Sequence, residues 1–245
     1  MKKSILLLSI LLISKLGFAQ IQPIKIEIDS VTFVDNSTSK RTYNINYHIK
    51  NNTNNEISFF LNPKSLIAFE ASSMTLFAVY KMYKNGVYEK MDGPFYELFF
   101  DELAIYENND DRKSNDNLEK IKTFFENKKR ELQLKIDNFK KTDPTKTDDW
   151  IFNHLNLLQS KIVLKPNESK KYTIITSWNR NRHFKIGDYE YYLDEKDRFE
   201  IELNLILNKS NRSEFLPESD FNYIKTNPNF IEGVFISNKK ELFFN

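Results

Sequence analysis

Apolar and polar residues alternate one by one in several separate stretches of this chain. In residues 24–28, isoleucines at every second position are separated by Lys25 and Glu27. The same alternation recurs in residues 43–49 and 199–207. Successive side chains of a strand point to opposite faces of a sheet, so this period predicts strands with one face toward a core. Turn-forming residues separate the strands, which favours a mainly β fold built from antiparallel sheets.

A β-hairpin is predicted around Asn85 and Gly86. An Asn-Gly pair tolerates the positive φ angles of a type I′ turn, and strand-forming residues flank it on both sides. The first of these strands, residues 76–83, carries apolar side chains on both faces. Both faces therefore need a cover, and a single partner sheet supplies only one.

Residues 51–55 contain four asparagines and interrupt the strand pattern. They lie between the strand at 43–49 and the start of the next strand at Ile57. Asparagine side chains satisfy nearby backbone groups and tolerate left-handed conformations, so this cluster predicts a turn. Only neutral amides are available there to contact a ligand, whereas a hard cation prefers carboxylates.

The period becomes helical in residues 117–141, and Pro144 ends that helix. A second helix is predicted over 148–158, so we expect a helical insertion at about 97–160 in an otherwise β domain. Its long helix is expected to bury its apolar stripe and to supply the second cover, with a solvent-exposed helical hairpin as the alternative. The stripe consists of Leu118, Ile121, Phe125, Leu132, Ile136 and Phe139.

Three further segments have a strand-and-turn pattern: LKPNESKKYTI at 164–174, DRFEIELNLIL at 197–207 and GVFISNKKEL at 233–242. Together they resemble bacterial immunoglobulin-like β-sandwich domains of secreted proteins. The resemblance implies an antiparallel immunoglobulin-like sandwich. The helical insertion departs from the simple family pattern.

The first 19 residues have the parts of a secretory signal peptide. Lys2 and Lys3 precede an apolar stretch at 5–13, and the small residues Gly17 and Ala19 follow it. The apolar stretch is shorter than the ~20 residues that a membrane anchor needs. We therefore expect cleavage after Ala19.

The ending FAQ of this segment resembles signal peptides of Bacteroidota-type bacteria. Export leaves one domain at 20–245 with no integral membrane segment. The expected location is the periplasm, with the cell surface and the medium as alternatives.

Removal of residues 1–19 also changes the charge of the chain. The complete sequence has 36 Lys+Arg and 34 Asp+Glu, and loss of Lys2, Lys3 and Lys15 leaves 33 against 34. A chain so close to neutral lacks the basic excess of a nucleic-acid-binding protein, so no nucleic-acid partner is expected. No cysteine is present, and the fold must be stable without disulfides.

No metal site or cofactor is predicted. His48, His154 and His183 lie far apart, whereas zinc ligands usually come in closely spaced pairs. The acidic segment at 107–119 lacks the glycine and the ligand spacing of an EF-hand loop.

No catalytic residue is predicted either, but one acidic cluster supports a hydrolase as the alternative function. Asp194, Glu195 and Asp197 could serve a carbohydrate-active or metal-assisted hydrolase, whose mechanism needs two carboxyl groups across a cleft. These acids follow one another in a predicted turn, where they are expected to be solvated.

Aromatic residues crowd into residues 80–106. Binding surfaces for sugars and proteins use such rings, and so do β cores. Tyr83, Tyr88, Phe95 and Tyr96 are the candidate ligand-binding patch. The expected function is that of an exported, non-enzymatic protein of the bacterial envelope that recognises a protein or a glycan. The sequence does not indicate an oligomeric state.

Overall fold

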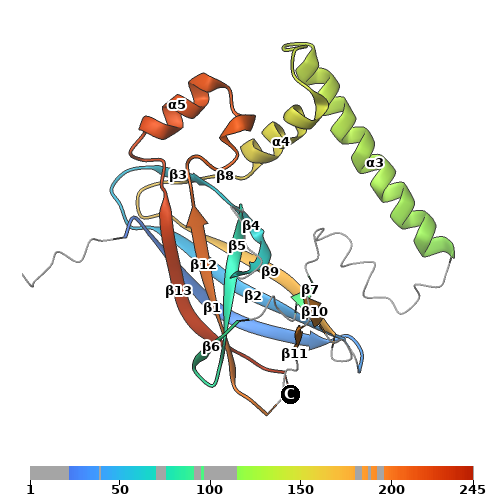
Figure 1. Cartoon of the computed structure of the whole chain (residues 1–245), viewed down its shortest axis with the longest axis vertical. Coiled ribbons are helices and arrows are strands. Elements are labelled where there is room, and N and C mark those ends of the chain that lie inside the picture. Colours follow the sequence, from blue (N-terminus) through green and yellow to red (C-terminus); the bar gives the residue numbers. More distant parts are fainter. Residues whose placement is uncertain are drawn as a thin grey trace, which may run out of the picture.

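Figure 1 shows a computed structural model of the chain, in which two β-sheets carry a group of helices at one end. The predicted signal peptide and the acids Asp194 and Glu195 lie outside the part of the chain that the structure describes. The described residues are 22–38, 40–69, 76–90, 95–96, 115–179, 184–186, 189–191 and 196–244.

The first sheet has the strand order β1-β2-β9-β7, and its neighbouring strands are antiparallel. The alternation predicted for residues 24–28 and 43–49 is confirmed, because the residues of the apolar phase are buried and their neighbours are not. Its strands are β1 (Ile24–Asp35), β2 (Lys40–Asn51), β9 (Ser169–Asn179) and β7 (Phe95–Tyr96).

The second sheet has the order β13-β12-β5-β4, and a short strand, β6, also pairs with β5. Its pairs are antiparallel except for β4 and β5, which run parallel, so the prediction of antiparallel sheets holds for most pairs but not for this one. Its strands are β13 (Gly233–Leu242), β12 (Phe199–Leu207), β5 (Phe77–Lys84), β4 (Asn62–Ala68) and β6 (Val87–Glu89). Two small antiparallel pairs complete the strands: β3 (Ile57–Phe60) with β8 (Lys161–Leu164), and β10 (Phe184–Ile186) with β11 (Tyr189–Tyr191).

The predicted hairpin joins β5 to β6. Asn85 has a φ of 52° and Gly86 a φ of 82°, as the two central positions of a type I′ turn require. The turn aligns Tyr83 directly opposite Tyr88. The Asn-Gly prediction is therefore confirmed.

One buried cluster joins the two larger sheets into a common core. The edge strands β1 and β13 meet at Asn238, whose side chain replaces a strand partner for Ile28. The Ile28 amide donates to Asn238 Oδ1 (2.7 Å), and Asn238 Nδ2 donates to the Ile28 carbonyl (3.2 Å). The strand pairing is irregular on both sides of this contact. The register of β1 against β2 shifts between Ile28 and Ser30, and the register of β12 against β13 shifts between Glu202 and Asn204.

The helical prediction is confirmed for the described part of the insertion, with residues 97–114 lying outside it. Figure 1 shows the long helix α3 projecting away from both sheets, and it packs against α4. No helix in the described part of the chain combines the length and the apolar character that a membrane span needs. The helices are α3 (Asn115–Lys140), α4 (Asp148–Gln159), the unpredicted α5 (Glu218–Thr226) and a short 3-10 helix, η2 (Ser213–Phe215).

The prediction that α3 buries its whole apolar stripe is wrong. Phe125 is 40% exposed, whereas Ile136 near the other end is 5% exposed. Because α4 has 12 residues against 26 in α3, it reaches only the C-terminal part of α3. There Phe139 of α3 contacts Trp150 of α4 (ring centroids 5.9 Å apart). The expected second cover of the β5–β6 hairpin is therefore not α3.

The stability of the core is expected to fall at alkaline pH. Burial raises the pKa of Tyr172 to about 12 and the pKa of the adjacent Tyr47 well above its usual value. Between pH ~10 and ~12 the unfolded chain therefore loses these protons while the folded chain keeps them, so the free energy of unfolding decreases as the pH rises. Urea unfolding at stepped pH measures this decrease.

The matched variant is Tyr172→Phe, which has no phenol to titrate. Its free energy of unfolding should fall less steeply across that interval, with the remaining slope coming from Tyr47 and Tyr83, whose pKa values burial also raises. An identical slope in the variant would show that Tyr172 does not contribute.

Candidate ligand-binding pocket

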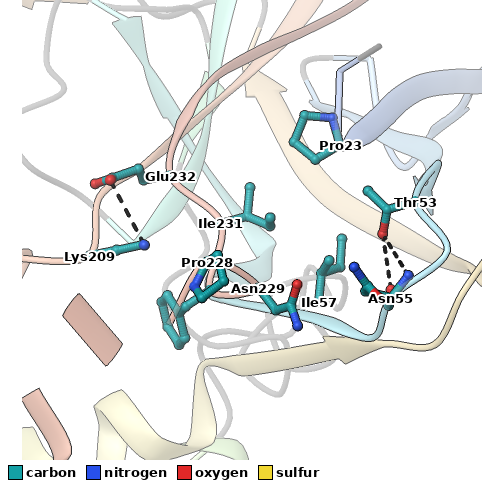
Figure 2. A pocket seen from close by; sticks show the side chains of 10 residues that line it. Pro23, Thr53, Asn55, Ile57, Lys209, Pro228, Asn229, Ile231 and Glu232 are labelled. Atoms are coloured by element: carbon teal, nitrogen blue, oxygen red, sulfur yellow. Dashed lines mark hydrogen bonds and ion pairs between the residues drawn. The ribbon is translucent and has the colours of Figure 1, made fainter. Parts of the chain in front are cut away.

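An open pocket of about 420 Å³ lies where four parts of the chain meet (Figure 2). The first lies just before β1, the second surrounds the asparagine-rich turn, the third follows β12, and the fourth links α5 to β13. The lining residues are Pro23, Thr53, Asn55, Ile57, Lys209, Pro228, Asn229, Phe230, Ile231 and Glu232.

The first wall is the predicted turn at residues 51–55, which we call the Asn loop. Asn51 is fully buried, and its Nδ2 lies within 3.1 Å of the carbonyl oxygens of Asn55, Leu164 and Lys165. Its Oδ1 accepts from both the amide and the hydroxyl of Thr53 (2.8 Å each). One internal side chain thus holds the loop and ties it to the turn after β8. The turn prediction is confirmed.

The other side of the Asn loop faces the pocket, which the sequence analysis missed. Asn55 is exposed, and its side-chain amide makes no hydrogen bond to the residues that the structure describes. In Figure 2, Thr53 and Asn55 lie together at one end of the pocket. The loop therefore presents the side-chain amide of Asn55 to the pocket, next to a Thr53 hydroxyl whose proton is donated within the loop.

The opposite wall is the segment at 228–232, which is fastened to β3. The Ser58 amide donates to the Asn229 carbonyl (2.9 Å), and the Ile231 amide donates to the Ser58 carbonyl (2.7 Å). Asn227 Oδ1 also accepts from the Asn229 amide (2.8 Å). These bonds fix the backbone of Asn229 and Ile231 on either side of buried Phe230.

A lysine–glutamate pair closes one end of the pocket. Lys209 Nζ donates to the Asn227 carbonyl (3.0 Å) and lies 4.0 Å from Glu232 Oε1. The two partners differ greatly in exposure, since the Lys209 side chain is 13% exposed and that of Glu232 59%. The positive charge is therefore sheltered, while the carboxylate faces water.

The pocket combines neutral polar groups with an apolar floor. The side-chain amides of Asn55 and Asn229 can each both donate and accept hydrogen bonds, whereas the Thr53 hydroxyl donates its proton within the Asn loop and can only accept from a ligand. Ile57 and Ile231 are buried beside them. Such a lining suits a small molecule that has both hydroxyl groups and apolar faces.

Comparisons with protein-family models, with curated proteins and with solved structures found no match to this chain.

The residues of the predicted aromatic patch are only partly brought together. Tyr83 and Tyr88 are in contact on the second sheet, with ring centroids 5.8 Å apart, and Lys239 Nζ lies 3.2 Å from the Tyr83 ring centroid. Phe95 and Tyr96 form β7 at the edge of the other sheet, and the structure does not describe their side chains. The prediction of a common four-residue patch therefore stays a prediction.

Tyr83 has a role within its own sheet. Its hydroxyl donates to Glu202 Oε1 (3.1 Å), and both side chains are at least half-buried. Burial, followed by the nearby Glu202 carboxylate, raises the pKa of Tyr83. This pair stabilises the outer face of the sheet, with cation–π contacts from Lys239 and, at Tyr88, from Lys81.

The described member of the acidic cluster is engaged in a structural contact. Asp197 Oδ2 pairs with Lys84 Nζ (2.6 Å), and Asp197 Oδ1 accepts from Asn85 Nδ2 (2.9 Å). The bond from Lys84, and next the bond from Asn85, lower the pKa of Asp197. Asp197 thus fixes the β5–β6 turn against the segment before β12.

The two described histidines are separate from each other. His48 Nδ1 lies 2.8 Å from Asp29 Oδ1 on the solvent-facing side of the first sheet. His154 is buried, stacks on Trp150 and contacts the Phe215 carbonyl through Nδ1 (2.7 Å). In the part of the chain that the structure describes, no three His, Asp or Glu side chains converge as a metal site would require.

Proposed function

We propose that this chain is an exported, non-enzymatic binding protein of the bacterial envelope, built as an immunoglobulin-like β-sandwich with a helical insertion, and that it recognises a glycan. The observation that supports a ligand is the pocket, whose volume of about 420 Å³ falls within the range of about 300–1,000 Å³ common for small-molecule sites.

Two properties of the lining favour a sugar over a purely apolar ligand. Sugar hydroxyls need partners that both donate and accept, and the side-chain amides of Asn55 and Asn229 do both. The apolar faces of a sugar ring also need hydrophobic contacts, which the half-buried Pro23 and the exposed Pro228 can supply. The sequence-based prediction names a protein as the alternative ligand to a glycan.

The hydrolase alternative receives no support from Asp197. A catalytic carboxylate needs access to substrate and an acid or base role, whereas Asp197 is paired with Lys84 and Asn85. Its lowered pKa also makes it a poor proton donor at neutral pH.

The pocket variants Asn55→Ala and Asn229→Ala test the proposal. Each removes a neutral hydrogen-bonding group, for which we expect affinity to fall about 3- to 10-fold. The measurement is binding of the purified protein to an array of bacterial and plant glycans, followed by titration calorimetry with the best ligand.

The matched control is Asn54→Ala, because Asn54 is an exposed neighbour in the same loop that does not line the pocket. Its affinity should equal that of the unchanged protein. An array without any bound glycan, or equal affinities in all four proteins, would refute glycan recognition through this pocket.

A further inference from the structure

We infer that the glycan carries a carboxylate and that Lys209 pairs with it in the pocket. The ligand class is therefore an acidic oligosaccharide, one that contains uronic-acid residues. This inference rests on the proposed function and names the chemical class that the same pocket selects.

The positive charge of Lys209 is incompletely neutralised within the protein. An ammonium group has three N–H donors, and the Asn227 carbonyl accepts from it at 3.0 Å. The carboxylate of Glu232 is 4.0 Å away, beyond hydrogen-bonding distance, and it is mostly hydrated. With its side chain only 13% exposed, Lys209 gains from a closer anion, because a sheltered charge is costly unless it is paired.

The ammonium group of Lys209 is also held in position. Lys209 follows β12 in a tight turn, where Asn208 Oδ1 accepts from the Ser210 amide (2.8 Å) and the Asn208 carbonyl accepts from the Asn211 amide (3.2 Å). Its Nζ is fastened to Asn227, next to the wall at 228–232. A charge that is already oriented loses little conformational entropy when a ligand binds.

The lining of the pocket carries one charge of each sign. Lys209 is the single cationic residue among those that line the pocket, and Glu232 is the single anionic one. A phosphate or sulfate ester would be better matched by an arginine fork or several donors, whereas one carboxylate fits one ammonium. The remaining lining groups are neutral and suit sugar hydroxyls.

Two variants distinguish an acidic ligand from a cationic one. Lys209→Met keeps the apolar stem but removes the charge, and Glu232→Gln removes the competing carboxylate at an exposed position. If the ligand is anionic, Lys209→Met weakens binding and Glu232→Gln strengthens it. A ligand with a positive group would give the reverse.

The experiment is titration calorimetry of the full protein with two matched probes, an oligogalacturonate and a galactose oligosaccharide of equal length. We expect the acidic probe to bind about tenfold tighter or more, since hydrogen bonds to charged groups exceed neutral ones by this amount. Lys209→Met should abolish the preference, Lys209→Arg should retain it, and Glu232→Gln should raise affinity for the acidic probe several-fold. Circular dichroism confirms that each variant is folded.

The outcomes separate this inference from the proposed function. Equal or tighter binding of the neutral probe would overturn the carboxylate preference and leave glycan binding intact. A preference that survives in Lys209→Met, or weaker acidic binding by Glu232→Gln, would overturn the role of Lys209. Binding of neither probe, together with an empty glycan array, would overturn both.

Discussion

Replacement of Phe244 by alanine is expected to lower the free energy of unfolding by about 3–5 kcal/mol, the usual cost of removing a buried phenylalanine. Phe244 is 2% exposed and lies between the two sheets. Its ring centroid is 4.7 Å from that of Trp178, 5.1 Å from that of Phe199 and 5.8 Å from that of Tyr43. Loss of the ring would leave a cavity bordered by aromatic residues of β2, β9 and β12.

The neighbouring residue provides a matched control for this variant. Phe243 is 44% exposed, so Phe243→Ala should cost less than about 1 kcal/mol. Its carbonyl accepts from the Tyr43 hydroxyl (2.6 Å) and from Arg41 Nη1 (2.7 Å), and a side-chain substitution leaves that carbonyl in place. Urea unfolding of the two variants measures the difference. Equal costs would show that the buried Phe244 ring stabilises the fold no more than the exposed Phe243 ring does.

Replacement of Asn51 by alanine is expected to cost about 3 kcal/mol. Asn51 is fully buried, and its removal leaves carbonyl groups of Leu164 and Lys165 without this donor. Each buried polar group that loses its partner costs about 1–3 kcal/mol, because the group has given up its contact with water. The amide and hydroxyl of Thr53 lose their acceptor in the same variant.

Asn54→Ala gives the same chemical change at an exposed position of the Asn loop. We expect it to alter the free energy of unfolding by less than about 0.5 kcal/mol. Urea denaturation curves of the two variants test this contrast. A cost for Asn51→Ala as small as that of the control would mean that the side-chain bonds do not stabilise the loop.

The sequence predicted the elements whose causes are local. The alternation around Tyr43 and Phe199 identifies strands and their inner faces, because side-chain direction repeats every two residues. The turn at Asn85 and Gly86 also depends on local φ preferences, and the structure has it as predicted.

The parts that were missed depend on contacts between distant residues. Phe125 has the spacing of a buried helix position, yet nothing in that spacing says how far the short partner helix extends. Likewise, Lys209 and Asn55 meet at one pocket through turns that have no periodic pattern. The asparagine cluster was a useful signal, but it indicated a turn and gave no sign of the wall across from it.

The bond between Ile28 and Asn238 has a consequence for the order of folding. These residues are separated by 210 positions, so β13 can join β1 only after a very large loop has closed. Hairpins such as β5–β6 have no such delay, and we expect them to form first. Topologies with many distant pairings fold in milliseconds to seconds, whereas local ones need microseconds to milliseconds. We therefore expect the edges of β1 and β13 to stay unpaired longest, and a second, unfolded chain could pair with either edge during that interval.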